Sequence, residues 1–218
     1  MKNSGVKLTL LILVSSLLIA RNISLAQNNN NCMTNGLIAG IPKSDLNNEE
    51  KAGLIQMREE EKLARDVYIT LGNTWGIPIF SNISRAEQAH TDAVKALLER
   101  YEIEDPVKDD AVGVFTSPEL AKLYNDLVKK GNTSLMDAFM TGATIEDLDI
   151  KDLDDLIKDT DNEDILVTYK NLNKGSRNHM RAFNHQISNR GSSYEPQFIS
   201  EAEFENILSS PHERGFQR

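Results

Sequence analysis

The 218-residue sequence contains little cysteine and few aromatic residues, and it has fewer basic than acidic residues. Its single cysteine, Cys32, excludes an internal disulfide and also the paired Cys motifs of a rubredoxin-like iron centre. Lys and Arg number 24 against 33 Asp and Glu, which gives a net charge of −9. An acidic chain without a basic patch binds nucleic acid poorly, so we expect no nucleic-acid partner.

Long apolar runs are scarce and are confined to the N-terminus. Lys2 and Lys7 precede an apolar run over residues 8–20, and Ser24-Leu25-Ala26 provides small residues at a cleavage position. This order of a basic, an apolar and a small-residue region is typical of a secretory signal peptide. Residues 1–26 are therefore predicted to be a signal peptide.

An uncleaved membrane anchor is the alternative for this segment. The apolar run is shorter than the roughly 20 residues that span a bilayer, and Arg21 follows it directly. Cleavage would remove Lys2, Lys7, Arg21 and no acid, so the net charge would fall from −9 to −12. We expect a mature protein without a membrane span, either secreted or held in the periplasm or at the cell surface.

Beyond residue 45, no segment alternates apolar and polar residues for long, as a strand would. Apolar residues recur instead at spacings of three and four, and Gly, Pro and Asn mark the breaks. The pattern predicts an all-α fold. The expected helices span residues 47–71, 82–101, 118–131, 134–158, 160–188 and 201–208.

Two helix starts carry local signals. Ser117 can cap a helix that has Pro118 at its first position, and Thr160 with Glu163 predicts a capping box. Four long helices with a short one between the second and third have the topology of a ferritin-like four-helix bundle with a crossover helix. The predicted organisation is a flexible Asn-rich tether at 27–45, the bundle at 46–190, and an extension with a short C-terminal helix at 191–218.

Polar residues interrupt the apolar stripes of the long helices. Glu61 fills a core position of the first helix, and Glu87 and His90 fill core positions of the second. Glu146 and His179 lie on the stripes of the third and fourth. Residues three apart share a helix face, so Glu87 and His90 can reach the same metal ion.

Each of these residues also has a structural interpretation. Glu61 belongs to an acidic run that is typical of a solvated face, Glu87 could close a capping box with Ser84, and His90 could be a hydrogen-bonded core histidine. Their joint placement on the stripes of adjacent helices favours a metal site. Buried carboxylates without partners are costly, and a cation supplies that partner.

The third helix is rich in further acids. They are expected to form a solvated face, although Asp149 is near enough to Glu146 to serve as a substitute ligand. The required Gly and terminal Glu of a calcium-binding loop are missing from this region. The acids in question are Asp147, Asp149, Asp152, Asp154 and Asp155.

Several motifs together carry a family resemblance. They are Met57-Arg58-Glu59-Glu60-Glu61-Lys62-Leu63-Ala64-Arg65-Asp66-Val67-Tyr68, Asn82-Ile83, Glu87-Gln88-Ala89-His90, Ile145-Glu146, Gly175-Ser176-Arg177-Asn178-His179 and Arg181-Ala182-Phe183. With these motifs, the chain over about residues 47–210 resembles the bacterial and archaeal domain-of-unknown-function family 2202, within the ferritin-like superfamily. The spacing of Glu61, Ala64 and Tyr68 also resembles the first helix of rubrerythrin-like di-iron proteins, in which the Glu is a metal ligand.

The resemblance implies a metal site that binds one or two ions. Its mixed carboxylate and imidazole ligands suit iron, manganese or zinc better than calcium or magnesium. A second Glu-x-x-His motif would need Glu at position 176, where this chain has Ser176, so Glu60, Asp149 or a water would complete a two-metal site. Ser176 could instead orient a ligand, and Tyr68 could donate a hydrogen bond nearby. The implied ligands are Glu61, Glu87, His90, Glu146 and His179.

Two functions from different classes follow. The leading hypothesis is an exported metal-binding protein, extended to a redox enzyme that acts on oxygen, peroxide or ferrous iron with an outside electron donor. The alternative is a metal-free bundle whose polar core is structural and which acts as an extracytoplasmic interaction or stress module. The sequence contains no assembly signal that would favour a storage cage, and it is compatible with a homodimer.

Overall fold

The computed structural model describes residues 38–215, and every regular element within that range is a helix. The all-α prediction is confirmed. No helix among these residues combines the length and the apolar character that crossing a membrane requires. The predicted signal peptide, Cys32 and the tether up to residue 37 lie outside the described range. The helices are α2 (Asn48–Trp75), α3 (Pro78–Arg100), α4 (Pro118–Gly131), α5 (Leu135–Asp159), α6 (Glu163–Ser188) and α7 (Glu201–Ser209).

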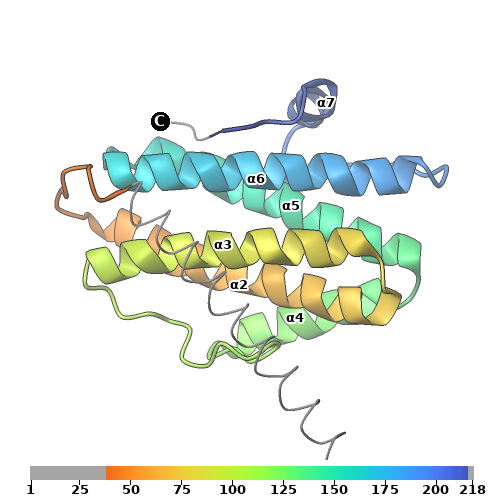
Figure 1. The fold of residues 1–218 in the computed structure, drawn as a ribbon, viewed down its shortest axis with the longest axis horizontal. Helices are drawn as coiled ribbons and strands as arrows, with labels where there is room; N and C mark the ends of the chain where they lie inside the picture. The colour runs from red at the N-terminus through yellow and green to blue at the C-terminus, as the bar shows by residue number, and fades with distance from the viewer. Residues whose placement is uncertain (1–37, 216–218) are drawn as a thin grey trace, which may run out of the picture.

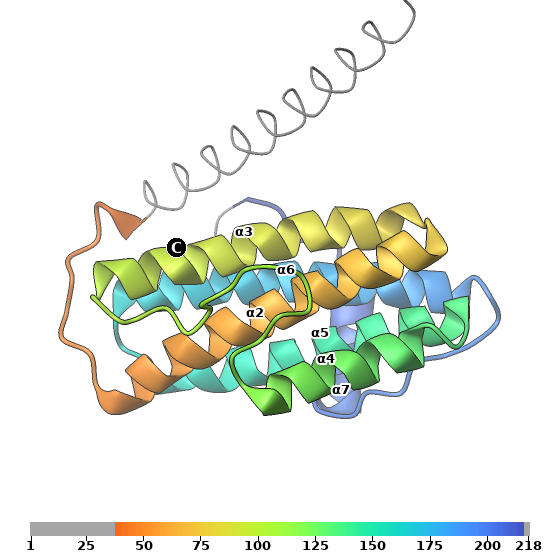
Figure 2. The same cartoon turned by 90° about the horizontal axis from the view of Figure 1, so that it is seen from below.

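The four long helices form two pairs that pack against each other. α2 packs mainly on α3 and α5 mainly on α6, while contacts of α2 with α5 and of α3 with α6 join the pairs (Figure 1). The shorter α4 lies along the outside, against α5 and α2 (Figure 2). Side chains from all four long helices can therefore meet in one interior.

The start of α2 is fixed by its cap, and its end by packing. The Asn47 side chain accepts from the Glu50 N–H at 2.7 Å, and the Glu50 carboxylate accepts from the Asn47 N–H at 3.0 Å. The helix does not stop at Gly72, as the sequence predicted, but continues to Trp75 and ends at Gly76 with φ +64°. Gly72 instead allows α3 to approach closely, because a Cβ there would lie 3.2 Å from the Phe80 Cβ.

Two further predictions of helix starts are wrong. α3 begins at Pro78 rather than at 82, so Ser84 lies inside the helix and caps nothing. Thr160 forms no capping box at the start of α6, because its hydroxyl donates to Glu50 Oε1 at 2.6 Å and the cap residue is Asn162. Thr160 thus ties the α5–α6 connection to the first turn of α2.

The apolar core divides into two clusters along the helices. One is built around Phe80, which lies 5.6 Å from Phe139 and 5.9 Å from Phe183 between ring centroids. The other contains Leu97 and Leu172 and lies nearer the opposite ends of the same helices. On α2, α3 and α6 the predicted site residues fall between the two clusters, and on α5 Glu146 lies between Ile145 and Ile150 of the first cluster. Together these residues form a polar layer.

The expected solvated face of α5 is wrong at Asp147, whose side chain is fully buried. Its carboxylate accepts from the Tyr194 hydroxyl at 2.8 Å and from the backbone N–H groups of Gln197, Phe198 and Ile199 at 2.5, 3.2 and 2.9 Å. This carboxylate therefore anchors the segment that precedes α7.

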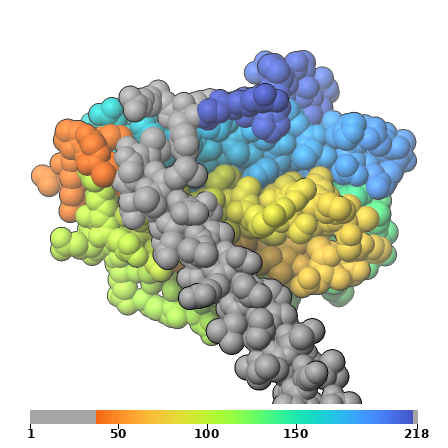
Figure 3. Space-filling view, in the orientation of Figure 1, coloured from red at the N-terminus to blue at the C-terminus, as the bar shows by residue number. Residues whose placement is uncertain are grey.

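The C-terminal segment covers part of the outer surface of α6 (Figure 3). Arg177 pairs with Glu213 at 2.6 Å, and Arg181 donates to the Ile207 carbonyl at 2.7 Å. The predicted short C-terminal helix is present as α7. Asp154, also expected in solvent, accepts a hydrogen bond from Asn173 of α6 at 2.6 Å.

Candidate metal centre

The structure brings all five predicted ligands together in the polar layer. Glu61 comes from α2, Glu87 and His90 from α3, Glu146 from α5 and His179 from α6. The three glutamates are no more than 2% exposed, and the His179 residue is 8% exposed. These residues lie on the apolar stripes of their helices. A residue on such a stripe faces the core, so the five side chains meet in the polar layer.

The five residues form two groups that share Glu87. Glu61, Glu87 and His90 make one group, and Glu87, Glu146 and His179 the other. In each group, one ligand atom per residue lies within 4.8 Å of the others. Glu87 Oε2 lies 2.7 Å from His90 Nδ1, and Glu87 Oε1 lies 2.8 Å from His179 Nδ1. The two oxygens of a single carboxylate thus face two different imidazoles.

The outer carboxylate of each group flanks its histidine. Glu61 Oε2 lies 3.3 Å from His90 Nδ1, and Glu146 Oε2 lies 3.4 Å from His179 Nδ1. The imidazole rings stack with centroids 5.6 Å apart and an interplanar angle of 29°. Each group therefore offers two carboxylates and one imidazole.

Gly175 makes room for this arrangement. A Cβ at this position would lie 2.5 Å from Cε1 and Nε2 of His90, so any larger residue would displace the ring. Gly175 belongs to a motif that carried the family resemblance, but no role was predicted for it. The signal available in the sequence was a glycine inside a long helix, directly before Ser176, because a glycine at such a position usually has a packing or functional reason.

Tyr68 holds the outer carboxylate of the second group. Its hydroxyl is fully buried and donates to Glu146 Oε1 at 2.5 Å, and it also lies 3.3 Å from the Gly142 carbonyl. This bond leaves Glu146 Oε2 facing His179. The hydrogen bond anticipated for Tyr68 is thus present, and its acceptor is a predicted ligand.

Ser176 points at Asp149. The hydroxyl makes a short hydrogen bond to Asp149 Oδ2 and also lies 3.2 Å from the Leu172 carbonyl. Asp149 follows Glu146 by three residues and so shares its helix face. The position where a second Glu-x-x-His motif would have its Glu is therefore paired with a carboxylate from α5. Asp149 is not part of either three-residue group.

Glu60 lies on the flank of the same layer. Its Oε1 accepts from Gln56 Nε2 at 3.0 Å, whereas Oε2 is buried without a hydrogen-bond partner. Burial, with the nearby charge of Asp152, raises the pKa of Glu60 to about 7.

Burial dominates the pKa values of the outer acids. It raises the pKa of Glu61 to about 8, and it also raises the pKa of Glu146. The pKa of Asp149 is well above its ordinary value because of burial and the neighbouring charges of Glu61 and Glu146. These carboxyl groups hold protons more tightly than the same groups in water.

Glu87 and the two histidines behave in the opposite way. Burial would raise the pKa of Glu87, but His179 and His90 outweigh it and lower that pKa. Burial opposes a charge on either imidazole, yet the carboxylates raise the pKa of His90 well above its ordinary value and that of His179 to about 10. Positive charge in this layer therefore takes the form of protons, which a metal cation can replace.

The donor set fits a transition-metal site. Glu61 Oε1 is buried without a hydrogen-bond partner, which is a cost that a bound cation would remove. Imidazole with carboxylate suits iron, manganese and zinc. Both groups have this composition, and Glu87 has one oxygen for each.

The comparisons with known proteins concern the same part of the chain. The family model described as "Uncharacterized protein domain (DUF2202)" matches residues 50–211, which include all five residues. The uncharacterized protein MJ0754 of Methanocaldococcus jannaschii is 59% identical over 181 residues, which cover 83% of this chain and 98% of the relative. The crystal structure of that hypothetical protein aligns with a TM-score of 0.78 over 80% of this chain and 99% of the other.

Proposed function

The chain belongs to the DUF2202 family, and we propose that it is an exported ferritin-like protein that binds iron or manganese in its core, with zinc as a further candidate. The proposed ligands are Glu61, Glu87, His90, Glu146 and His179. The observation that carries the proposal is the pair of buried ligand groups that share Glu87. Two such groups are the minimum for a centre that holds two ions.

The ferritin-like assignment rests on where the ligands stand. In ferritin-like di-metal proteins each long helix of a four-helix bundle supplies inward carboxylates or a Glu-x-x-His pair. Here α2 and α5 each supply one glutamate, α3 supplies Glu87 and His90, and α6 supplies His179. On this proposal α4 is the crossover helix, and Asp149, held by Ser176, stands in for the carboxylate that α6 lacks.

Charge supports a cation in this place. The layer holds Glu61, Glu87, Glu146 and Asp149 but only two imidazoles, so two protonated histidines do not neutralise four ionised acids. Ionised groups of one sign in a dry interior are costly, which favours either protons or a metal ion. Metal ions would neutralise the excess with all ligands deprotonated.

A bound iron or manganese ion would supply Lewis acidity and would pass electrons to oxygen or peroxide, and those electrons would come either from an outside donor or from ferrous iron that is oxidised in the process. The residues of the chain have separate tasks around it. Tyr68 holds Glu146 in place through its hydroxyl proton, Ser176 orients Asp149, and the apolar clusters on either side exclude water.

The test is elemental analysis of residues 27–218, produced with iron, manganese and zinc all present and purified without a metal-affinity tag. We expect about two ions per chain, as a two-group site requires. Glu87→Gln should remove both ions, because both groups lose a ligand. The matched control is Glu99→Gln, an exposed position on the same helix.

A well-folded, metal-free protein under these conditions would contradict the proposal. So would a metal content that Glu87→Gln leaves unchanged.

A second candidate, a metal-free bundle that acts as an extracytoplasmic interaction or stress module, has one observation in its favour. Each imidazole Nδ1 lies within 3.4 Å of two carboxylates, so ion pairs could hold the layer together without metal. The double variant Glu61→Ala and His179→Ala separates the two cases. Large loss of metal with modest loss of fold supports the centre, whereas loss of fold with no metal to lose supports the structural network.

A further inference from the structure

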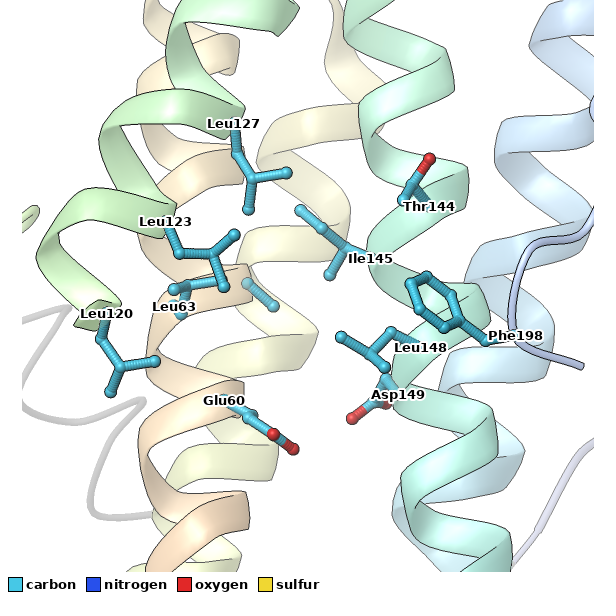
Figure 4. A pocket seen from close by; sticks show the side chains of 11 residues that line it. Glu60, Leu63, Leu120, Leu123, Leu127, Thr144, Ile145, Leu148, Asp149 and Phe198 are labelled. Atoms are coloured by element: carbon cyan, nitrogen blue, oxygen red, sulfur yellow. The ribbon is translucent and has the colours of Figure 1, made fainter.

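A cavity of about 160 Å³ lies between α2, α4 and α5. α4 lines it through Leu120, Leu123 and Leu127, and Phe198, from the segment before α7, closes another side (Figure 4). Eight of the eleven lining residues are apolar. An engineered apolar cavity of about 150 Å³ stays dry and binds benzene, so this volume suits a small organic molecule.

The rim of the cavity is open to solvent. Leu123 is 40% exposed and Phe198 is 42% exposed, although both are large apolar side chains. Exposed apolar surface of this kind is typical of places that bind ligands or partners. A ligand could therefore enter without unfolding a helix.

Two carboxyl groups stand at one end of the cavity. Glu60 and Asp149 approach each other there from α2 and α5 (Figure 4). Glu60 Oε2 is buried without a hydrogen-bond partner, which marks an unused polar contact at that end. The rest of the lining offers one further polar residue, Thr144.

This polar end adjoins the candidate metal centre. Glu60 precedes the predicted ligand Glu61, and Asp149 makes its hydrogen bond to Ser176 inside the polar layer. Asp149 thus belongs to the wall of the cavity and to the surroundings of the centre at once. A molecule in the cavity would have its polar group next to the metal ligands.

We infer that the cavity binds a small uncharged organic molecule with an apolar body of about the size of benzene and one O–H group directed at Glu60 and Asp149. Apolar walls make burial of an ionic head group costly, so a neutral head is selected. A carboxyl group can exchange a hydrogen bond with a hydroxyl, which selects an alcohol-like or hydroperoxide-like head. The binding stands on the cavity alone, and the role of the ligand as a substrate rests on the proposed function.

The test compares four probes of nearly equal size: benzyl alcohol, toluene, benzylamine and benzoate. Binding is measured by calorimetry and by chemical shifts in the side chains of Leu123 and Leu127, on metal-free and on metal-loaded protein. We expect benzyl alcohol to bind about tenfold more tightly than toluene, a difference typical of one good hydrogen bond. Both ionic probes should bind more weakly than benzyl alcohol.

Two variants locate the site. Leu123→Trp should fill the rim and weaken all binding, and the fold should be kept because Leu123 is partly exposed and leaves room for a larger side chain. Glu60→Ala should bring the affinity for benzyl alcohol closer to that for toluene, with Asp149 left as the remaining partner, and should not weaken toluene. Tighter binding of benzylamine or benzoate than of benzyl alcohol would overturn the neutral head group.

Two other results would also overturn the inference. One is the absence of any probe binding to a folded chain. The other is a dimer that Leu123→Glu dissociates, which would assign the apolar rim to a second copy. Because the probes are tested without metal as well, failure here is distinguishable from failure of the proposed metal site, which elemental analysis tests independently.

Discussion

The side of α2 that faces the 101–117 connection buries charged groups, as does the side that faces the polar layer, but the two sides balance their charge differently. On the first side, Lys62 and Asp66 are at most 1% exposed and lie 2.6 Å apart. The Lys62 ammonium also donates to the carbonyls of Ala111 and Val114 at 3.1 and 2.9 Å. Its three donors are all in use.

The same network holds the connection through two arginines. Arg58 pairs with Asp105 at 3.1 Å, and Arg65 pairs with Asp110 at 2.9 Å and with Asp66 at 2.8 Å. Together with Lys62, three cations meet three carboxylates. This outer network, formed by Arg58, Lys62, Arg65, Asp66, Asp105 and Asp110, is neutral without any added ion.

The polar layer lacks that balance. It has more carboxyl groups than basic ones, and Glu61 Oε1 has no partner. Burial of charge alone therefore does not indicate a ligand site. A complete network fixes a loop, whereas an excess of buried acid requires protons or a cation.

Breaking the outer network should produce the largest effect on stability. Lys62→Met leaves Asp66 buried with one cation fewer, and we expect the free energy of unfolding to fall by about 3 kcal/mol. Metal content should stay unchanged because Lys62 contacts no proposed ligand. Denaturant unfolding and elemental analysis measure the two quantities, with Lys95→Met on an exposed site as the control. Loss of metal from a folded Lys62→Met chain would contradict the separation of the outer network from the polar layer.

Gly175→Ala tests the packing of the polar layer. The new Cβ would lie 2.5 Å from the His90 ring and push it away from Glu87. Overpacking should cost about 1–3 kcal/mol of stability, and metal affinity should fall by more than the loss of stability explains. The control is Gly40→Ala, where a Cβ meets nothing within 4 Å. Unchanged metal affinity in a folded Gly175→Ala chain would remove His90 from the centre.

Stability of the metal-free protein should fall as the pH rises. Glu61 has its pKa raised from 4.5 to about 8, and His179 has its pKa raised from 6.5 to about 10. The folded state therefore holds more protons than the unfolded state between about pH 4.5 and 10, and the free energy of unfolding decreases across that window.

Bound metal should flatten this dependence, because the ligands are then deprotonated in the folded state as well. The measurement is Tm between about pH 5 and 9 for both forms, with the gap between them widening as the pH rises. Parallel curves would show that metal does not replace these protons.

Tyr68→Phe should give the smallest effect. It removes the hydrogen bond to Glu146 and leaves the ring packing intact, so we expect a loss of about 0.5–1.5 kcal/mol. Metal affinity should fall about tenfold, as it does when a residue that orients a ligand is lost. Metal titration of the folded variant measures this, and Tyr169→Phe, whose buried hydroxyl has no hydrogen-bond partner, is the control.

The sequence was sufficient to predict the helices and the convergence of the five candidate ligands. Glu61 and the pair of Glu87 and His90 stand on apolar stripes, and helical periodicity alone turns such residues inward. A different signal, the local stop that a glycine indicates, predicted the end of the first helix at Gly72, which is wrong because close packing on Phe80, rather than a turn, requires that glycine. Local signals compete with tertiary contacts that the sequence does not display.

Long-range partners explain what the sequence did not predict. No role was predicted for Lys62 and Asp66, which are buried because the 101–117 connection covers them. Asp147 looks like one acid among many, but its partners come from residues 194–199. Thr160 finds its acceptor at Glu50, at the other end of the chain's helical region. None of the contacts with the 101–117 connection, residues 194–199 or Glu50 follows from spacing along one helix.

The anchoring of Asp147 has a consequence for when the chain can finish folding. The carboxylate is buried in α5, but the Tyr194 hydroxyl and the N–H groups of Gln197, Phe198 and Ile199 reach it only after some fifty more residues have been made. Until then α5 carries an acid that it cannot bury without penalty. We therefore expect the packing of α5 to be completed only once residues 194–199 have been made, even if the other helices associate earlier.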